Sequence, residues 1–157
     1  MTQHHTPNDT PTSRSGGLSI DVAIRFLDTH RELAMATLGG GLPRIRAFQV
    51  MRVGRVGGAV ELFFATAPFK AVYNQLHETP YVEMLATAGT VSVRMGGEAR
   101  FDVEEALRRD LYAAPGNDVF RRLYPEFDML AYARVRLSFM DYFDDAPVPC
   151  VYEHWEF

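Results

Sequence analysis

Apolar and polar residues alternate in several short segments of the chain, and glycine-containing turns separate these segments. The alternation is clearest over residues 91–95 and 132–143. A period of two residues is typical of a β-strand with one buried face. Residues 39–41 and 54–58 are the strongest turn signals. We therefore expect an antiparallel sheet built from strands in hairpin order.

Six segments have the composition and length of strands. They are residues 33–38, 44–53, 59–66, 81–87, 90–101 and 132–143, and residues 150–157 are a candidate seventh. A sheet of this size leaves two unpaired edges unless it closes on itself. The sequence thus predicts a mainly β (α+β) fold, a six-stranded antiparallel β-barrel with flanking helices.

Apolar residues spaced three and four apart predict helices between some of the strands. The first covers residues 19–30, with Ser19 as its N-cap. A second opens at Pro68, because proline fits the first helical position. A third covers residues 102–114 and begins with a sequence that resembles a capping box. A short fourth helix is expected over residues 119–124.

The length of 157 residues and a hydrophobic content of 47% fit one domain with a core of its own. Residues 1–17 are polar and rich in Thr, Ser, Pro and Gly. We expect them to form a disordered tail. Residues 18–157 are expected to form the domain.

Charge and cysteine content exclude some classes of partner. The net charge of -4 argues against nucleic acid and against an anionic membrane surface, because a polyanion requires a field of the opposite sign. No run of 18 apolar residues is present, so no membrane span is expected. The single cysteine, Cys150, cannot form an internal disulfide, and a reducing cytoplasm is the expected location.

The segment Thr66-Ala67-Pro68-Phe69-Lys70 leads from a predicted strand directly into a predicted helix. The N-terminus of a helix offers free N–H groups and a partial positive charge, so an anion would bind there with the Thr66 hydroxyl and Lys70. Lys70 is the single lysine beside fifteen arginines. This favours a site that needs a compact charge on a flexible stem, although a solvated surface lysine is the alternative.

A second cationic segment is Arg44-Ile45-Arg46-Ala47-Phe48-Gln49. In a regular strand Arg44, Arg46 and Phe48 share one face. Two guanidinium groups beside an aromatic ring would hold a phosphate or the edge of a flavin. The alternative is an exposed strand face without a ligand.

Other motifs carry less weight. No phosphate-binding glycine loop precedes a helix, no metalloprotease spacing of His and Glu is present, and no serine nucleophile elbow appears, so no metal or hydrolase site is predicted. Asp141, Asp144 and Asp145 fit a solvated turn better than a cation site. His154 is a candidate donor to a ligand, or part of a C-terminal segment packed on a neighbouring subunit.

Several segments together resemble one protein family. They are Ala36-Thr37-Leu38, Pro43-Arg44-Ile45-Arg46-Ala47-Phe48-Gln49-Val50-Met51, Leu62-Phe63-Phe64-Ala65-Thr66-Ala67-Pro68-Phe69-Lys70-Ala71-Val72, Asn74-Gln75-Leu76, Pro80-Tyr81-Val82-Glu83, Val91-Ser92-Val93-Arg94 and Gly97-Glu98-Ala99. In order and spacing they resemble the pyridoxamine 5′-phosphate oxidase-like split-barrel flavoproteins. The resemblance covers most of residues 33–101 and extends more loosely to the C-terminus.

The resemblance implies a split β-barrel homodimer that holds two FMN molecules in clefts between its subunits. Arg46 and Lys70 then look like phosphate ligands, and Thr66 looks like a hydroxyl partner near the phosphate or the ring. The strand from Arg46 to Gln49 then looks like the wall facing the isoalloxazine. The cofactor-binding residues implied in this way are Arg44, Arg46, Phe48, Gln49, Thr66, Phe69, Lys70 and, from the C-terminal segment of the partner, Trp155.

The chain departs from the true oxidases at its end, which reads Glu153-His154-Trp155-Glu156-Phe157 in place of their Arg-Leu-x-Pro-like motif. Vitamin-forming activity is therefore not carried over, and the catalytic residues are not assigned. We expect an FMN-dependent oxidoreductase acting on a small molecule, with NAD(P)H as a candidate electron donor. The alternatives are a non-catalytic flavin or haem binder and a pyridoxal-phosphate binder without flavin.

Overall fold

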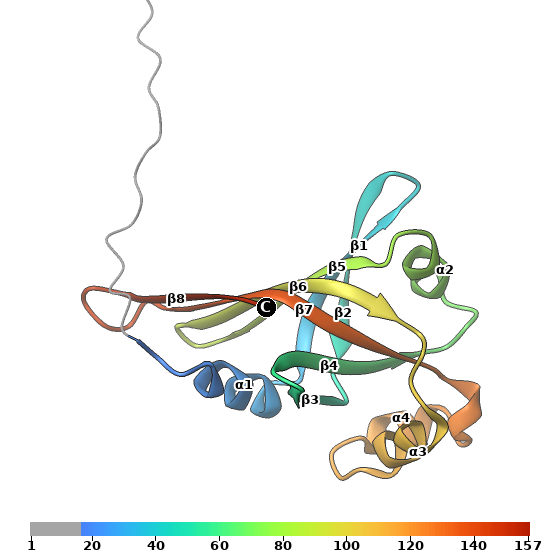
Figure 1. Ribbon diagram of the computed structural model, residues 1–157. Helices are drawn as coiled ribbons and strands as arrows, with labels where there is room; N and C mark the ends of the chain where they lie inside the picture. Colours follow the sequence, from blue (N-terminus) through green and yellow to red (C-terminus); the bar gives the residue numbers. More distant parts are fainter. Residues whose placement is uncertain (1–16) are drawn as a thin grey trace, which may run out of the picture.

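The computed structural model describes residues 17–157, so the tail predicted for residues 1–17 lies outside the described residues except for Gly17. The described residues form eight strands, four α-helices and a short 3₁₀ helix (Figure 1). In chain order these are α1 (Ile20–Thr29), β1 (Glu32–Gly39), β2 (Leu42–Gln49), β3 (Arg52–Val56), β4 (Ala59–Thr66), α2 (Ala71–Glu78), β5 (Tyr81–Ala88), β6 (Val91–Arg100), α3 (Glu105–Ala113), α4 (Asp118–Leu123), η1 (Phe127–Met129), β7 (Ala131–Asp144) and β8 (Val151–Glu156).

All strands belong to one antiparallel sheet in the order β2-β1-β5-β6-β7-β4-β3, and β8 pairs with β7. The long strand β7 makes this branching possible. Its first half pairs with β4 and its second half with β8, while β6 runs along its other side. Strand β8 therefore extends the sheet beyond the end of β4 (Figure 1).

The strands at the two ends of this order, β2 and β3, are joined by only Val50 and Met51. Because two residues span only a few ångströms, the sheet must curl until its edges approach one another. The Val50 N–H donates to the Arg31 carbonyl and the Met51 N–H donates to the Phe63 carbonyl, so the connection is fixed at both residues. No ladder joins β2 to β3, and the result is a curled, open sheet of the split-barrel kind.

The predicted mainly β fold with flanking helices is confirmed, whereas the number of six strands is wrong. The segment expected as one strand over residues 44–53 is divided at Val50 and Met51. The turn expected over residues 54–58 is confined to Gly57 and Gly58, whose φ angles of 57° and 88° favour glycine. Gly54 instead lies inside β3, and the candidate strand at the C-terminus is present as β8.

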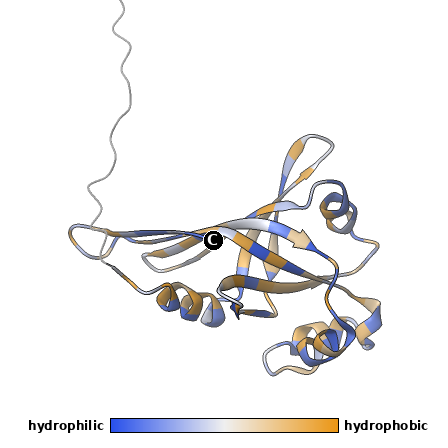
Figure 2. Cartoon of the chain, in the orientation of Figure 1, coloured by the Kyte–Doolittle hydropathy of each residue, from blue (hydrophilic) through white to orange (hydrophobic). Residues whose placement is uncertain are grey.

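Hydrophobic and hydrophilic residues follow one another along the strands (Figure 2), and the buried apolar side chains form two hydrophobic clusters. The larger cluster fills the inside of the curled sheet, and Ala23 and Leu27 of α1 complete it. The smaller cluster lies on the outer face of β4 and β7, where α3, α4 and η1 cover Phe63 and Tyr132. The helices thus cover two separate parts of the sheet and leave its remaining outer face open.

Helix boundaries agree with the sequence where a cap is present. Ser19 caps α1 by accepting a hydrogen bond from the Asp21 N–H, as predicted. Helix α2 begins at Ala71, so Pro68 lies in the preceding turn and not in the first helical position. The capping box expected at Asp102 is absent because the Asp102 carboxylate binds Arg134 at 2.8 Å.

Within residues 17–157 no helix is both long enough and apolar enough to cross a membrane.

Candidate functional site

Arg46 and Thr66 are brought to the same end of the curled sheet by an aromatic contact inside it. The rings of Phe48 in β2 and Phe64 in β4 meet edge to face, with centroids 4.7 Å apart. Successive antiparallel pairings make β2 and β4 antiparallel. Arg46, two residues before Phe48, and Thr66, two residues after Phe64, therefore share the inner face and lie toward the same end. Helix α2 follows Thr66 there, and we call this the α2 end.

The Arg46 side chain is held by two neutral groups. Its guanidinium donates to Thr37 Oγ1 at 3.0 Å and to Gln75 Oε1 at 2.8 Å. The Thr37 hydroxyl donates to the same Gln75 oxygen at 2.8 Å, which closes a triangle of hydrogen bonds. Burial and the nearby charge of Arg44 lower the pKa of Arg46. These contacts fix the orientation of a cation without neutralising it.

Close packing of α2 on β1 makes this triangle possible. Gln75 lies on α2, and a Cβ at Gly39 would come within 2.6 Å of the Gln75 Nε2 atom. A larger residue at position 39 would therefore displace the amide that holds Arg46. The glycine predicted only as part of a turn is thus the last residue of β1 and admits the helix side chain.

Lys70 lies at the N-cap position of α2 and is exposed. Its Nζ atom lies 5.7 Å from the centre of the Tyr124 ring, next to the end of α4. No side chain caps the helix, and no acidic residue lies in its first turn. The Lys70 and Tyr73 N–H groups donate to the Ala67 and Lys70 carbonyls, so the Ala71 and Val72 N–H groups are the donors left for an anion at this terminus.

Donors and cations dominate the α2 end. Arg44, Arg46 and Lys70 form no ion pair with any carboxylate in residues 17–157. The neighbouring side chains of Thr37, Thr66 and Gln75 are neutral. A set of guanidinium, ammonium, hydroxyl and backbone N–H donors without a competing carboxylate fits a phosphate group.

The other residues predicted for the site lie in different surroundings. Arg44 is exposed on the same face of β2 as Arg46, and Phe69 is 82% exposed in the turn before α2. Phe48 packs against the core, whereas Gln49 lies on the opposite face of the strand. Alternate residues of the predicted wall from Arg46 to Gln49 therefore face opposite sides of the sheet.

Trp155 lies in β8 opposite Met140, on the second half of β7. Thr66 pairs with Ala131 at the start of β7. Within one chain the structure therefore separates Trp155 from the α2 end by most of the length of this strand. A second copy would have to supply Trp155 to that site, as the family resemblance implies.

Thr37 and Gln75 were not predicted as site residues. Both lie in segments that support the family resemblance, but a neutral residue gives no signal of its own in a search for anion ligands. Their role depends on the pairing of β1 with β2 and on the position of α2 over β1. The one hint in the sequence is the position of Thr37, which continues the alternating series of the apolar residues Leu33 and Met35.

A polar network on the outer face connects β6, β7 and β8. Asp141, a buried carboxylate, accepts hydrogen bonds from Arg94 at 2.9 Å, from the Tyr152 hydroxyl at 3.0 Å and from His154 Nδ1 at 2.5 Å. Burial alone would raise the pKa of Asp141, but these three donors lower it. Asp141 is therefore engaged by protein groups, and the cation site considered for Asp141, Asp144 and Asp145 is not formed within residues 17–157.

Removal of the His154 imidazole is expected to destabilise the protein more at low pH than at high pH. The hydrogen bond with Asp141 is the main cause that raises the pKa of His154. A raised pKa stabilises the fold below the unfolded value of about 6.5, and that contribution is lost as the pH rises through the folded value. Urea unfolding of wild type and His154→Gln between pH 5.5 and 9 measures the difference. A difference independent of pH would contradict the proton-linked contact.

Comparison with known proteins supplies the fold relationship. Neither a family model nor a curated protein sequence matches the chain. Among solved structures, a protein related to general stress protein 26, of the pyridoxinephosphate oxidase family, from Clostridium acetobutylicum is 11% identical with a TM-score of 0.67, covering 88% of this chain and 94% of that one. A pyridoxamine 5′-phosphate oxidase-related, FMN-binding protein from Nostoc punctiforme is 16% identical with a TM-score of 0.60, covering 90% and 98%.

The chain has the pyridoxamine 5′-phosphate oxidase-like fold. The resemblance predicted from the sequence is thus confirmed at the level of the fold. A haem-binding protein from Mycobacterium smegmatis has the same architecture, with 14% identity and a TM-score of 0.65, covering 88% of this chain and 58% of that chain. Proteins of the pyridoxamine 5′-phosphate oxidase-like fold therefore include both flavin-binding and haem-binding members, so the fold alone assigns no ligand to this chain.

Proposed function

We propose that this chain is an FMN-binding protein whose cofactor phosphate is held at the α2 end. The observation that carries the proposal is Arg46, a partly buried cation held by Thr37 and Gln75 and left without a carboxylate partner in residues 17–157. A buried charge without a counter-charge is costly, and an anionic ligand would remove that cost. Lys70, Thr66 and the first N–H groups of α2 add donors at the same end.

We further propose that the protein is an oxidoreductase acting on a small molecule, with NAD(P)H as a candidate electron donor. FMN supplies hydride and electron transfer when it is bound, so the protein needs to supply binding, orientation and a suitable polarity. Arg46 and Lys70 would bind the phosphate, and Thr37 and Gln75 would hold Arg46 in the required orientation. A reducing cytoplasm fits the free thiol of Cys150.

An absorbance spectrum of the purified protein tests the proposal. Flavin bands that bleach on addition of NAD(P)H and return with an electron acceptor support an FMN-dependent oxidoreductase. Flavin bands that no donor and acceptor pair changes support a flavin-binding protein without catalysis. A Soret band in place of flavin bands would contradict FMN binding and favour the haem alternative.

The protein is expected to form a homodimer through the outer face of β1, β2 and β5. Ile45 is 74% exposed there, and its cross-strand neighbour Ala36 and the exposed Leu85 continue an apolar surface. Exposed apolar surface on an edge strand is stabilised when a second copy covers it. Light scattering of wild type and Ile45→Glu measures the assembly: we expect a dimer that the variant weakens, and a monomeric wild type at micromolar concentration contradicts this expectation.

A further inference from the structure

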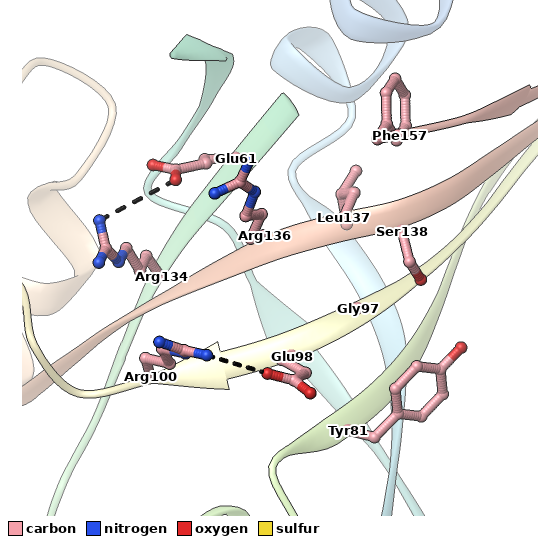
Figure 3. Close-up of a pocket in the computed structure, with 10 residues that line it drawn as sticks. All are labelled: Glu61, Tyr81, Gly97, Glu98, Arg100, Arg134, Arg136, Leu137, Ser138 and Phe157. Atoms are coloured by element: carbon pink, nitrogen blue, oxygen red, sulfur yellow. Dashed lines mark hydrogen bonds and ion pairs between the residues drawn. The ribbon is translucent and has the colours of Figure 1, made fainter. Parts of the chain in front are cut away.

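A cavity of about 370 Å³ lies on the open outer face of the sheet, between β4, β5, β6 and β7 (Figure 3). Its volume is in the range of small-molecule sites. None of Arg44, Arg46, Thr66 and Lys70 lines the cavity. It is therefore distinct from the α2 end, and a ligand can bind there without flavin.

Most charged side chains around the cavity have a partner. Arg134 lies 4.0 Å from the buried carboxylate of Glu61, and Arg100 binds Glu98 at 3.3 Å (Figure 3). Arg134 also binds Asp102 at 2.8 Å. These ion pairs use the carboxylates that surround the cavity. One arginine that lines the cavity takes part in none of these ion pairs.

That cation is Arg136, an exposed residue in the middle of the cavity wall. It pairs in register with Glu61 on one side and Glu98 on the other, yet neither carboxylate is within ion-pair distance of its guanidinium. Within residues 17–157 Arg136 has no ion pair. A guanidinium that faces a cavity without a partner can take one carboxylate in two parallel hydrogen bonds.

Aromatic side chains form the other part of the cavity. Tyr81 and Phe157 are 43% and 44% exposed and lie on opposite sides of the cavity, with Phe157 near Leu137 (Figure 3). Exposed aromatic faces at a cavity stack on planar ligands. The ligand should therefore have a planar apolar part in addition to its negative charge.

A β-bulge shapes the floor of the cavity. The register of β6 and β7 shifts between Gly96 and Gly97, where Ser138 is the additional residue on β7. A Cβ at Gly96 would lie 2.8 Å from the Tyr81 hydroxyl and 2.6 Å from the Phe139 ring, so the glycine lets both rings approach the sheet. Bulges of this kind frequently redirect side chains next to binding sites.

We propose that this cavity binds a small aromatic monocarboxylate, with the carboxylate on Arg136 and the ring between Tyr81 and Phe157. Glu61 and Glu98 flank Arg136 and would repel a second negative charge. A single carboxylate therefore fits better than a phosphate dianion. The protein would thus bind a second ligand, an aromatic monocarboxylate, at a place separate from the proposed flavin site.

Titration of the full chain with benzoate, followed by NMR shifts of the Gly97 and Ser138 amides, tests this proposal. We expect saturable binding of benzoate. Benzamide, a neutral molecule of the same shape, should bind at least about tenfold more weakly, because the loss of one charge-assisted hydrogen bond corresponds to about that factor. Phenyl phosphate, a dianion, should also bind more weakly than benzoate, because Glu61 and Glu98 repel its second negative charge. These comparisons use the wild-type protein, so they do not depend on the folding of a variant.

The variant Arg136→Gln should weaken benzoate binding at least about tenfold. Arg25→Gln, which removes an exposed charge on α1, is the matched control and should leave it unchanged. Absence of saturable NMR shifts in wild type would overturn the proposal. This includes the case in which a second copy covers this face and prevents benzoate from binding. So would equal binding of benzoate and benzamide, or equal benzoate binding by wild type and Arg136→Gln. Loss of FMN binding with retained benzoate binding would contradict only the flavin proposal.

Discussion

Replacing Arg46 and Lys70 together with alanine is expected to raise the Kd for FMN by about 10²- to 10⁴-fold. Each change removes a charge-assisted hydrogen bond to the phosphate, which contributes about 1.5–3 kcal/mol. The two side chains come from β2 and from the start of α2 but share one phosphate, so comparison of the double variant with the two single variants measures how far their contributions are coupled. Titration of the flavin-free single and double variants, followed by quenching of flavin fluorescence, measures the three affinities.

Two further variants separate a specific site from a general effect of charge. Arg25→Ala removes one positive charge from α1 and should bind FMN as wild type does. Lys70→Arg should bind more weakly than wild type, since a planar guanidinium and a compact ammonium reach different oxygen atoms. Unchanged affinity in the double variant would remove both residues from the site. Full affinity in Lys70→Arg would remove only the inference drawn from the single lysine.

Phe64→Ala is expected to lower the free energy of unfolding by about 3–5 kcal/mol, the usual cost of removing a buried phenylalanine. Phe64 is fully buried, and its ring contacts both Phe48 and Phe101 inside the curled sheet. The contact with Phe48 also joins β2 to β4, which places Arg46 and Thr66 at the same end. The variant should therefore lose FMN affinity as well as stability.

Phe69→Ala is the matched control, because Phe69 is the same residue type five positions along the chain and is mostly exposed. Its effect on the unfolding of the flavin-free protein should stay within about 0.5 kcal/mol. Urea denaturation of both variants, monitored by circular dichroism, gives the comparison. A similar loss of stability in the two variants would contradict the position of Phe64 in the core.

Alternation of residues predicted most of the sheet. The segments at residues 59–66, 81–87 and 132–143 correspond closely to β4, β5 and β7. The last two were recognisable because alternate residues contact the core, which imposes a period of two, whereas residues 59–66 were recognisable by their aromatic and aliphatic content and are buried on both faces. Helix α1 was recognisable for the equivalent reason, since its buried face repeats every three to four residues and Ser19 caps it.

Tertiary contacts decided the features that the sequence did not predict. Residues 44–53 are continuously strand-like in composition, and they divide into β2 and β3 because the chain passes from one edge of the sheet to the other at Val50 and Met51. Helix α3 begins at Glu105 and not at Asp102, because Arg134, 32 residues away, binds the Asp102 side chain. Neither the passage of the chain between the two sheet edges nor the interaction of Arg134 with Asp102 can be predicted from a local sequence pattern.

The residues of the candidate site likewise fall into those that the sequence predicted and those that it did not. Lys70 was predicted because a positive charge beside a helix N-terminus has a direct chemical meaning, and Arg46 because it shares a strand face with Arg44 and Phe48 and because the family resemblance implies a phosphate ligand there. Thr37 and Gln75 were missed because neutral residues acquire a role only through the register of β1 on β2 and the packing of α2. The binding role of all these residues stays a prediction, and affinity measurements test it.

Titration of the flavin-free protein with FMN and with riboflavin tests the phosphate site most directly, because the two ligands differ only in the phosphate group. If Arg46, Lys70 and the start of α2 bind that phosphate, FMN should bind at least about 100-fold more tightly than riboflavin. Equal dissociation constants for the two flavins, or no binding of FMN, would contradict a phosphate site at the α2 end.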